Sequence, residues 1–269
     1  MQLDQAQIAI RERSWSENLD LALHVLRTHG VALAGCALVG ILPAALFNHS
    51  AIVWANSGSI AEVPESRTFY FLMILVMIET PLVTAPITLY LGRALFVAKP
   101  RPRELARDFV SCLPQLILLQ LILRTILIVP VITWIIPYAL WPYLNEVILL
   151  ERNPLIGRRG QISTLKRNSL LHRSNSGDFI AQSLGAGCLA AMLVAALIWT
   201  QGSLLENLLG LHLGSTARTV EVQIAMWLVA IYFTVARFLG YLDQRIRNEG
   251  WEVELLLRAE RERLVRQIG

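Results

Sequence analysis

The chain has 269 residues, of which 55% are hydrophobic and 16% are charged, and its mean hydropathy is +0.51. Soluble domains contain about 25% charged residues, and the apolar residues here come in long runs without the amphipathic period of soluble helices, so an ordinary soluble fold is excluded. The net charge of +4 and the pI near 9.2 do not indicate nucleic-acid binding, because the basic residues lie in connections between apolar runs, where membrane topology and anionic headgroups account for them.

Basic residues alternate with apolar stretches along the chain. Nineteen of the 24 Lys and Arg residues fall in four segments, 1–30, 98–108, 151–178 and 243–269. Cytoplasmic connections of membrane proteins retain Lys and Arg, so these four segments are predicted to be cytoplasmic. The connections at 53–68 and 201–221 carry one Arg each and are predicted to face the other side.

The sequence predicts an all-α integral membrane helical bundle of about six transmembrane helices, with additional amphipathic cytoplasmic helices. A bilayer-crossing helix needs roughly 20 residues, and six spans satisfy this at about 31–52, 69–97, 107–129, 132–150, 179–200 and 222–242. They form one membrane domain, 31–242, between a cytoplasmic N-terminal segment, 1–30, and a cytoplasmic amphipathic tail helix, 243–269.

The third and fourth spans come from one apolar run, 109–150. As a single helix this run would be about 63 Å long, roughly twice the hydrocarbon thickness. Pro130 and Pro137 interrupt it, and proline removes a backbone donor and disfavours helix before it. A hairpin also places all four basic segments on the cytoplasmic side, which a single crossing does not.

Polar residues at membrane depth are candidates for function. They are Glu79, Arg124, Asn145, Glu146 and Arg237. Charged groups in hydrocarbon face the bundle interior or a water-filled cavity. Similar depths in the predicted spans pair Glu79 with Arg124 and Glu146 with Arg237. We favour the interpretation that these pairs tie helices together; the alternative is a polar path or a headgroup pocket between helices.

Small residues recur at four-residue spacing in the first and fifth spans. The stripes are Cys36, Gly40 and Ala44, and Gly187, Ala191 and Ala195. Such stripes allow close helix approach. Contact within one chain is the favoured explanation, and the stripes are also compatible with a homo-oligomer.

Two basic cytoplasmic segments are predicted to be amphipathic helices. Ile162, Leu165, Ser169 and His172 keep helical spacing beside basic side chains, as expected of a helix in the headgroup layer. Opposite charges at i, i+4 support a second helix in the tail. Side chains expected to contact lipid headgroups or a protein partner are Arg158, Arg159, Lys166, Arg167, Arg173, Arg245, Arg247 and Trp251.

Catalytic signatures are absent from the sequence. It contains no HExxH, no GxSxG and no Cys/His metal cluster. We therefore expect no enzymatic activity, no cofactor and no metal. One enzymatic alternative stays open: an intramembrane enzyme that acts on lipid, with its polar groups near Glu146, Glu151 and Asp243.

The loop and tail carry a family resemblance. The segment 237–254, RFLGYLDQRIRNEGWEVE, resembles the ending of a group of uncharacterised bacterial multi-pass proteins. Glu151, followed by Lys166-Arg167-Asn168-Ser169, is similar to the loop of the glycerophosphodiester phosphodiesterase membrane-domain superfamily, from which it departs at Asn168. The phosphodiesterase catalytic domain is absent, so the resemblance implies an α-helical bacterial inner-membrane protein and not that activity.

Two functions follow as expectations. The first is a non-enzymatic multi-pass protein of the bacterial inner membrane with both termini cytoplasmic. It would be an accessory or scaffold subunit that binds anionic lipid headgroups and a membrane or cytoplasmic protein partner at the cytoplasmic face. The alternative is a permease-like component that moves a small or lipidic solute through a polar path at Glu79, Arg124, Glu146 and Arg237.

Overall fold

The computed structural model describes residues 14–57, 65–95, 97, 100–128, 141–155, 157, 162–172, 176–208, 210 and 214–249. Within these ranges the regular structure is helical and contains no strand, so the predicted all-α bundle is confirmed. Five of the described segments are long and apolar enough to cross a membrane, namely Trp15–Asn56, Ser66–Ala94, Pro102–Ile126, Ile180–Ser203 and Ala217–Arg247. The protein is therefore a multi-pass membrane protein.

Helix α1, Trp15–Asn56, begins well before the first predicted span. Ser14 starts it with a capping box: the Ser14 hydroxyl oxygen accepts from the backbone N–H of Glu17, and the Glu17 carboxylate accepts from the backbone N–H of Ser14. His29 departs from helical geometry, with φ −107° and ψ 16°, so α1 bends at that residue.

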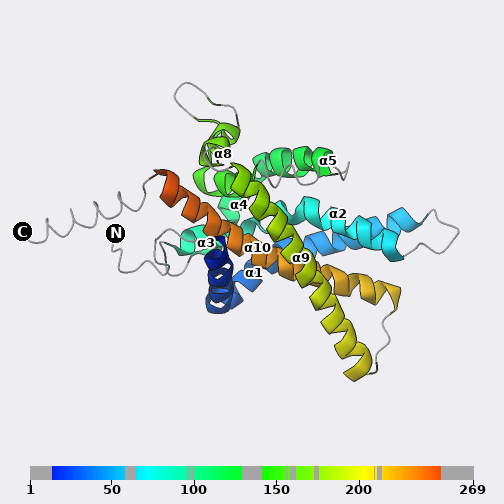
Figure 1. Ribbon diagram of the computed structural model, residues 1–269. Coiled ribbons are helices and arrows are strands. Elements are labelled where there is room, and N and C mark those ends of the chain that lie inside the picture. Colours follow the sequence, from blue (N-terminus) through cyan, green and yellow to red (C-terminus); the bar gives the residue numbers. More distant parts are fainter. Residues whose placement is uncertain are drawn as a thin grey trace, which may run out of the picture.

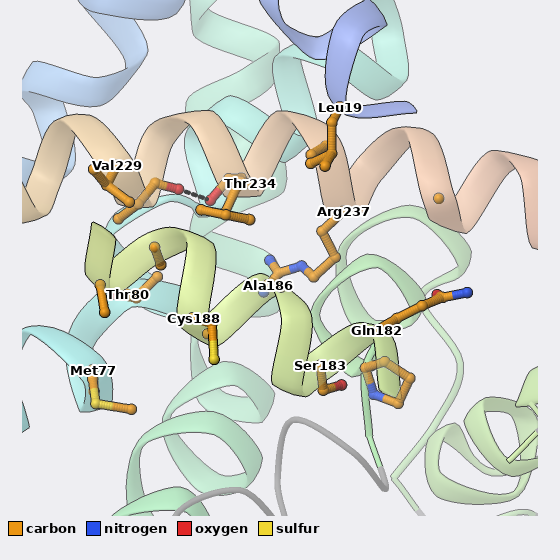
Figure 2. Close-up of a pocket in the computed structure, with 18 of the residues that line it drawn as sticks. Leu19, Met77, Thr80, Gln182, Ser183, Ala186, Cys188, Val229, Thr234 and Arg237 are labelled. Carbon is orange, nitrogen blue, oxygen red and sulfur yellow. Dashed lines mark hydrogen bonds between the residues drawn. The ribbon is translucent and has the colours of Figure 1, made fainter. Parts of the chain in front are cut away.

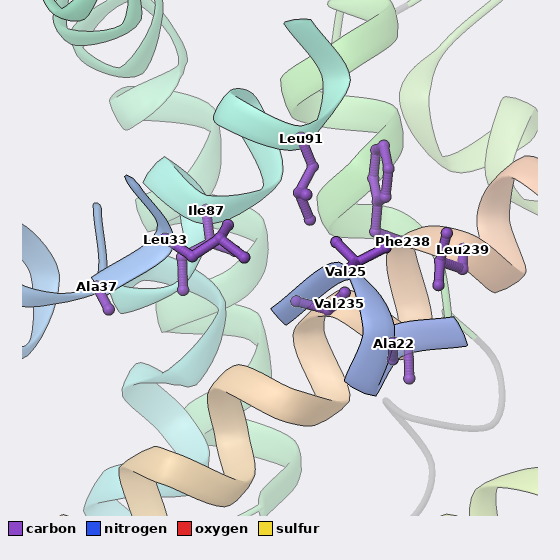
Figure 3. Close-up of a cluster of buried hydrophobic side chains, with 10 residues drawn as sticks. Ala22, Val25, Leu33, Ala37, Ile87, Leu91, Val235, Phe238 and Leu239 are labelled. Atoms are coloured by element: carbon purple, nitrogen blue, oxygen red, sulfur yellow. The ribbon is translucent and has the colours of Figure 1, made fainter. Parts of the chain in front are cut away.

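The part of α1 before this bend belongs to the core. Ala22 and Val25 pack in one apolar cluster with Val235 and Phe238 of α10, Ser215–Glu249 (Figure 3). The hydroxyl of Tyr232 on α10 also donates to the Leu19 carbonyl oxygen at 3.3 Å. The start of α1 is thus held beside the second half of α10.

Two prolines divide the second span into α2, Glu65–Val83, and α3, Ala85–Ala94. Pro81 lies inside α2, and Pro86 lies in the first turn of α3, where a missing N–H is tolerated. Thr84 joins the two helices, and both its backbone N–H and its hydroxyl donate to the Thr80 carbonyl oxygen. The second span is therefore broken at Thr84, between the two prolines.

The third span consists of α4, Pro102–Leu116, the π-helical turn η2, Ile117–Ile122, and α5, Leu123–Ile128. Pro102 is the first residue of α4, a position where the fixed φ of proline matches the helix and its missing N–H breaks no hydrogen bond. Pro114 removes one intrahelical donor, and the backbone widens into the π-helical turn three residues later.

Of the predicted fourth span, 132–150, the structure describes residues 141–150. They form α7, Leu144–Glu146, and the π-helical η3, Val147–Glu151, which pack against α3 and α4. Arg152, with φ 53°, ends this segment in the left-handed region. The hairpin in 109–150 depends on residues outside the described ranges and stays a prediction.

Helix α10 is the centre of the bundle. It contacts α1, α2, α3, α8 (Thr164–His172) and α9 (Ser176–Ser203, continued by η4, Leu204–Leu208). Figure 1 shows α9 crossing α10 at the outside of the bundle. None of the most apolar window of α9 is buried, whereas 61% of the corresponding window of α10 is buried. Helix α9 is therefore the least integrated of the five long helices.

Candidate functional site

A large groove lies between α9 and the rest of the bundle (Figure 2). Its volume is about 1450 Å³. Ordinary small-molecule pockets are smaller, with volumes of about 300–1,000 Å³. We call it the α9–α10 groove. Its walls come from α9 and α10, with contributions from α2, the start of α1, the η2–α5 segment and residues 141–143. Because the apolar window of α9 is not buried, the groove opens beside α9 to the surroundings of the bundle.

The two ends of the α9–α10 groove differ in polarity. The polar end is lined by Asn18, Gln182, Ser183, Arg237, Asp243 and Arg247. The apolar end is lined by Phe69, Met73, Val194, Ile198, Trp199 and Met226, most of which belong to one apolar cluster. In Figure 2, Gln182, Ser183 and Arg237 lie toward one side, and Met77, Thr80 and Val229 lie toward the other. The groove therefore has both charged and apolar walls, and the η2–α5 segment adds Gln120 and Arg124 to its polar lining.

Small residues of α9 line the groove instead of packing against a helix. Gly187, Ala191 and Ala195 all face it, and a Cβ atom at Gly187 would meet no heavy atom within 4 Å. On α1, in contrast, a Cβ atom at Gly40 would lie 2.1 Å from the Val83 carbonyl oxygen. The stripe on α1 thus makes the close contact that the sequence predicts, whereas the stripe on α9 leaves room for another molecule.

The predicted pair of Glu146 and Arg237 is present at the wall of the groove. Arg237 Nε donates to Glu146 Oε1 at 2.7 Å, and the Glu146 side chain is completely buried. Glu146 Oε2 and Arg237 Nη2 have no hydrogen-bond partner among the described residues. The neighbouring Asn145 is also buried, and neither of its side-chain polar atoms has a partner in the described part of the chain. Arg237 lines the groove, and Glu146 holds it from behind.

The second predicted pair, Glu79 with Arg124, is wrong. Glu79 Oε2 accepts from Asn48 Nδ2 of α1 at 3.2 Å, and Arg124 Nη1 donates to Gln120 Oε1, also at 3.2 Å. Similar depth did not bring the two charges together because they lie on different sides of α2. Glu79 faces α1, whereas Arg124 lines the groove.

A polar cluster joins three elements at the end of η3; we call it the Glu151 cluster. Arg167 of α8 donates to Glu151 through Nε at 2.6 Å and through Nη2 at 3.0 Å. The Tyr241 hydroxyl of α10 donates to Glu151 Oε1 at 2.8 Å, and Arg245 lies 3.9 Å from the same oxygen. The cluster therefore fixes α8 and η3 to α10. Two residues that carry the family resemblance, Glu151 and Arg167, are in direct contact in it.

The Glu151 cluster predicts a pH dependence of stability. Burial alone would raise the pKa of Glu151, but hydrogen bonds from Arg167 and Tyr241 and the charges of Arg167 and Arg245 hold this pKa below its usual range. A carboxyl with a lowered folded-state pKa stabilises the fold above its unfolded pKa, about 4.3 for Glu, and this contribution is lost as the pH falls through the folded-state pKa.

We therefore expect Glu151→Gln to lower the thermal stability of the detergent-solubilised protein at pH 7. The difference from wild type should shrink as the pH is lowered below about 4, because wild-type Glu151 becomes protonated as well. Asp20→Asn, at an exposed position of α1, is the matched control and should change little. A difference between Glu151→Gln and wild type that is the same at every pH contradicts this account.

The other predicted contact residues lie in different places. Arg247 lines the groove and donates to Asp243 at 2.9 Å. Lys166 is exposed on α8, near the exposed side chains of Ile162 and Leu165. Four of them, Arg158, Arg159, Arg173 and Trp251, lie outside the residues whose side chains the structure describes.

Sequence reasoning missed several residues of these sites. Asn48 and Gln120 are uncharged polar residues inside predicted spans, so a search at membrane depth for amides as well as charges finds both. Asp108, at the start of the third span, forms ion pairs with Arg93 and Arg152. The periodicity of the sequence does not indicate these ion pairs, because their three residues come from three separate segments of the chain.

In the described ranges no group of three or more His, Cys, Asp and Glu residues could hold a metal ion. Comparison of the chain with protein-family models, with curated proteins and with solved structures gives no match.

Proposed function

We propose that this protein is a non-enzymatic multi-pass protein of the bacterial inner membrane that binds a membrane lipid in the α9–α10 groove. One observation carries the proposal: a groove of about 1450 Å³ has the charged side chains of Arg237, Asp243 and Arg247 from the second half of α10 on its walls, and apolar side chains such as Val194 and Met226 farther along the same walls. Lipids have the same division between headgroup and chains. A groove that opens beside an unburied transmembrane helix is filled by lipid more readily than by water, because apolar walls favour apolar contents.

The position of the groove in the predicted topology supports a lipid of the cytoplasmic leaflet. The start of α1, the start of α9 and the end of α10 line its polar end, and all three are adjacent to predicted cytoplasmic segments. The headgroup would then lie near the cytoplasmic surface, and the chains would extend toward the bilayer centre along Val194 and Met226. Basic side chains at this level are attracted to anionic lipids.

The lipid-binding role fits an accessory or scaffold subunit. Exposed apolar side chains such as Met192 of α9 provide a surface for a membrane partner, and exposed Lys166 and Leu165 of α8 suit the headgroup layer. Lipid bound under α9 would set the position of this helix and hence the surface that it presents.

One observation favours the alternative, a permease-like component for a lipidic solute. Arg124 and Arg237, two of the residues in the predicted polar path, both line the groove. Glu79 and Glu146 do not line it and bond to Asn48 and Arg237. The groove therefore supports a binding site better than a continuous path, and transport is the second candidate.

Lipid retention by groove variants tests the proposal. Ala191 lines the groove, whereas Ala196, on the same helix, is exposed and does not line it. We expect Ala191→Trp to reduce the lipid that co-purifies with the protein, measured by native mass spectrometry, by about fivefold, corresponding to about 1 kcal/mol. Ala196→Trp should retain as much lipid as wild type. Equal retention by Ala191→Trp and wild type, with both folded, contradicts lipid binding in the groove.

A further inference from the structure

The charged side chains that line the groove come from two parts of the bundle, α10 and the η2–α5 segment. Among the described residues, four charged side chains line the groove: Arg124, Arg237, Asp243 and Arg247. Asp243 accepts from Arg247 at 2.9 Å, so the single acidic residue of this set already has a basic partner. The lining side chains therefore carry three positive charges and one negative charge, and Glu146, which lies behind the wall, balances the charge of Arg237.

Arg237 is the basic residue best placed to bind a headgroup. It extends from α10 toward the groove, across from Ala186 and Gln182 of α9 (Figure 2). Its side chain is 22% exposed although it lies within a transmembrane helix. Glu146 engages it through Nε alone, and a guanidinium has five N–H donors in a planar fork. Most of its hydrogen-bonding capacity is therefore not used by Glu146.

Glu146 fixes the direction of this guanidinium. It is fully buried behind Arg237 and accepts from Nε at 2.7 Å. A guanidinium held in this way loses little conformational freedom when it binds a second anion, and its planar fork matches the oxygens of a phosphate. Glu146 is thus a positioning residue and does not itself contact the lipid.

On this basis we infer that the groove binds a phospholipid of net negative charge, with Arg237 bound to its phosphate and Gln182 and Asn18 close to the polar part of the headgroup. A zwitterionic lipid is bound less well, because its ammonium group meets basic walls whose one carboxylate is paired with Arg247. This inference rests on the proposed function and specifies the ligand class of the same groove.

The test is competition between two lipids. Full-length protein is reconstituted in nanodiscs with equal amounts of phosphatidylglycerol and phosphatidylethanolamine, released into detergent, and analysed for bound lipid by native mass spectrometry. Wild type should retain phosphatidylglycerol over phosphatidylethanolamine by about fivefold or more. Arg237→Lys retains the charge, so it should keep a smaller preference.

The decisive variant removes both charges of the buried pair together, as Glu146→Leu with Arg237→Met. It should still bind lipid but show no preference between the two lipids. If this variant is folded and keeps the wild-type preference, or if wild type shows no preference, the inference about Arg237 is wrong while lipid binding stands. If Ala191→Trp retains as much of both lipids as wild type, lipid binding in the groove is itself wrong, so the two failures are distinguishable.

Discussion

Replacing Glu146 by alanine should strongly destabilise the protein, because it leaves Arg237 without its buried partner. Arg237 Nε is bonded to Glu146 Oε1 at 2.7 Å, and the Glu146 side chain has no solvent exposure. Removing one partner of a buried ion pair leaves an uncompensated charge, which costs about 3–5 kcal/mol. Thermal unfolding in detergent should show a melting temperature lowered by many degrees, or little folded protein at all.

The double variant Glu146→Leu with Arg237→Met is the control. Replacing a buried ion pair by apolar residues of similar size is often neutral or stabilising, so this variant should unfold close to the wild-type temperature. Recovery in the double variant shows that the loss in Glu146→Ala comes from the unpaired arginine. If the single variant is as stable as wild type, the pair does not hold the helices together.

Replacing Gly40 by leucine should also be strongly destabilising, because it forces α1 away from α2. A Cβ atom at Gly40 would lie 2.1 Å from the carbonyl oxygen of Val83 and 2.8 Å from its carbonyl carbon. These are backbone atoms, so no side-chain rotation relieves the overlap. Overpacking typically costs about 1–3 kcal/mol and occasionally more, and we expect the upper part of that range and a melting temperature lowered by several degrees.

Gly35→Leu is the matched control for Gly40→Leu. Gly35 is exposed on the same helix, and a Cβ atom there would meet nothing within 4 Å. Both substitutions replace Gly by the same better helix former, so the difference between them reports the contact with Val83. Similar melting temperatures for the two variants contradict the close approach of α1 and α2.

The membrane depth of each residue in the predicted spans correctly paired Glu146 with Arg237. The same criterion wrongly paired Glu79 with Arg124. Depth defines one coordinate, whereas contact also requires that two side chains lie on facing sides of their helices. Helical rotation placed Glu79 toward Asn48 of α1 and Arg124 toward the groove. Uniformly apolar helices give little information about rotation, because lipid-facing and buried positions have similar composition.

The groove was not predictable for a related reason. The stripe Gly187, Ala191 and Ala195 is what a helix–helix contact requires, and Gly40 on α1 shows that the same pattern can make one. What distinguishes the two is whether another helix lies opposite, and that depends on the arrangement of the whole bundle. The helical segments themselves were predictable, because composition and length determine them.

A structure of the protein in nanodiscs that contain phosphatidylglycerol tests the central proposal most directly. We predict lipid density in the α9–α10 groove, with the headgroup phosphate within hydrogen-bond distance of Arg237 and the chains along Val194 and Met226. A structure in which α9 closes onto α2 and α10, and in which Ala191 is in contact with these helices, would contradict lipid binding in the groove.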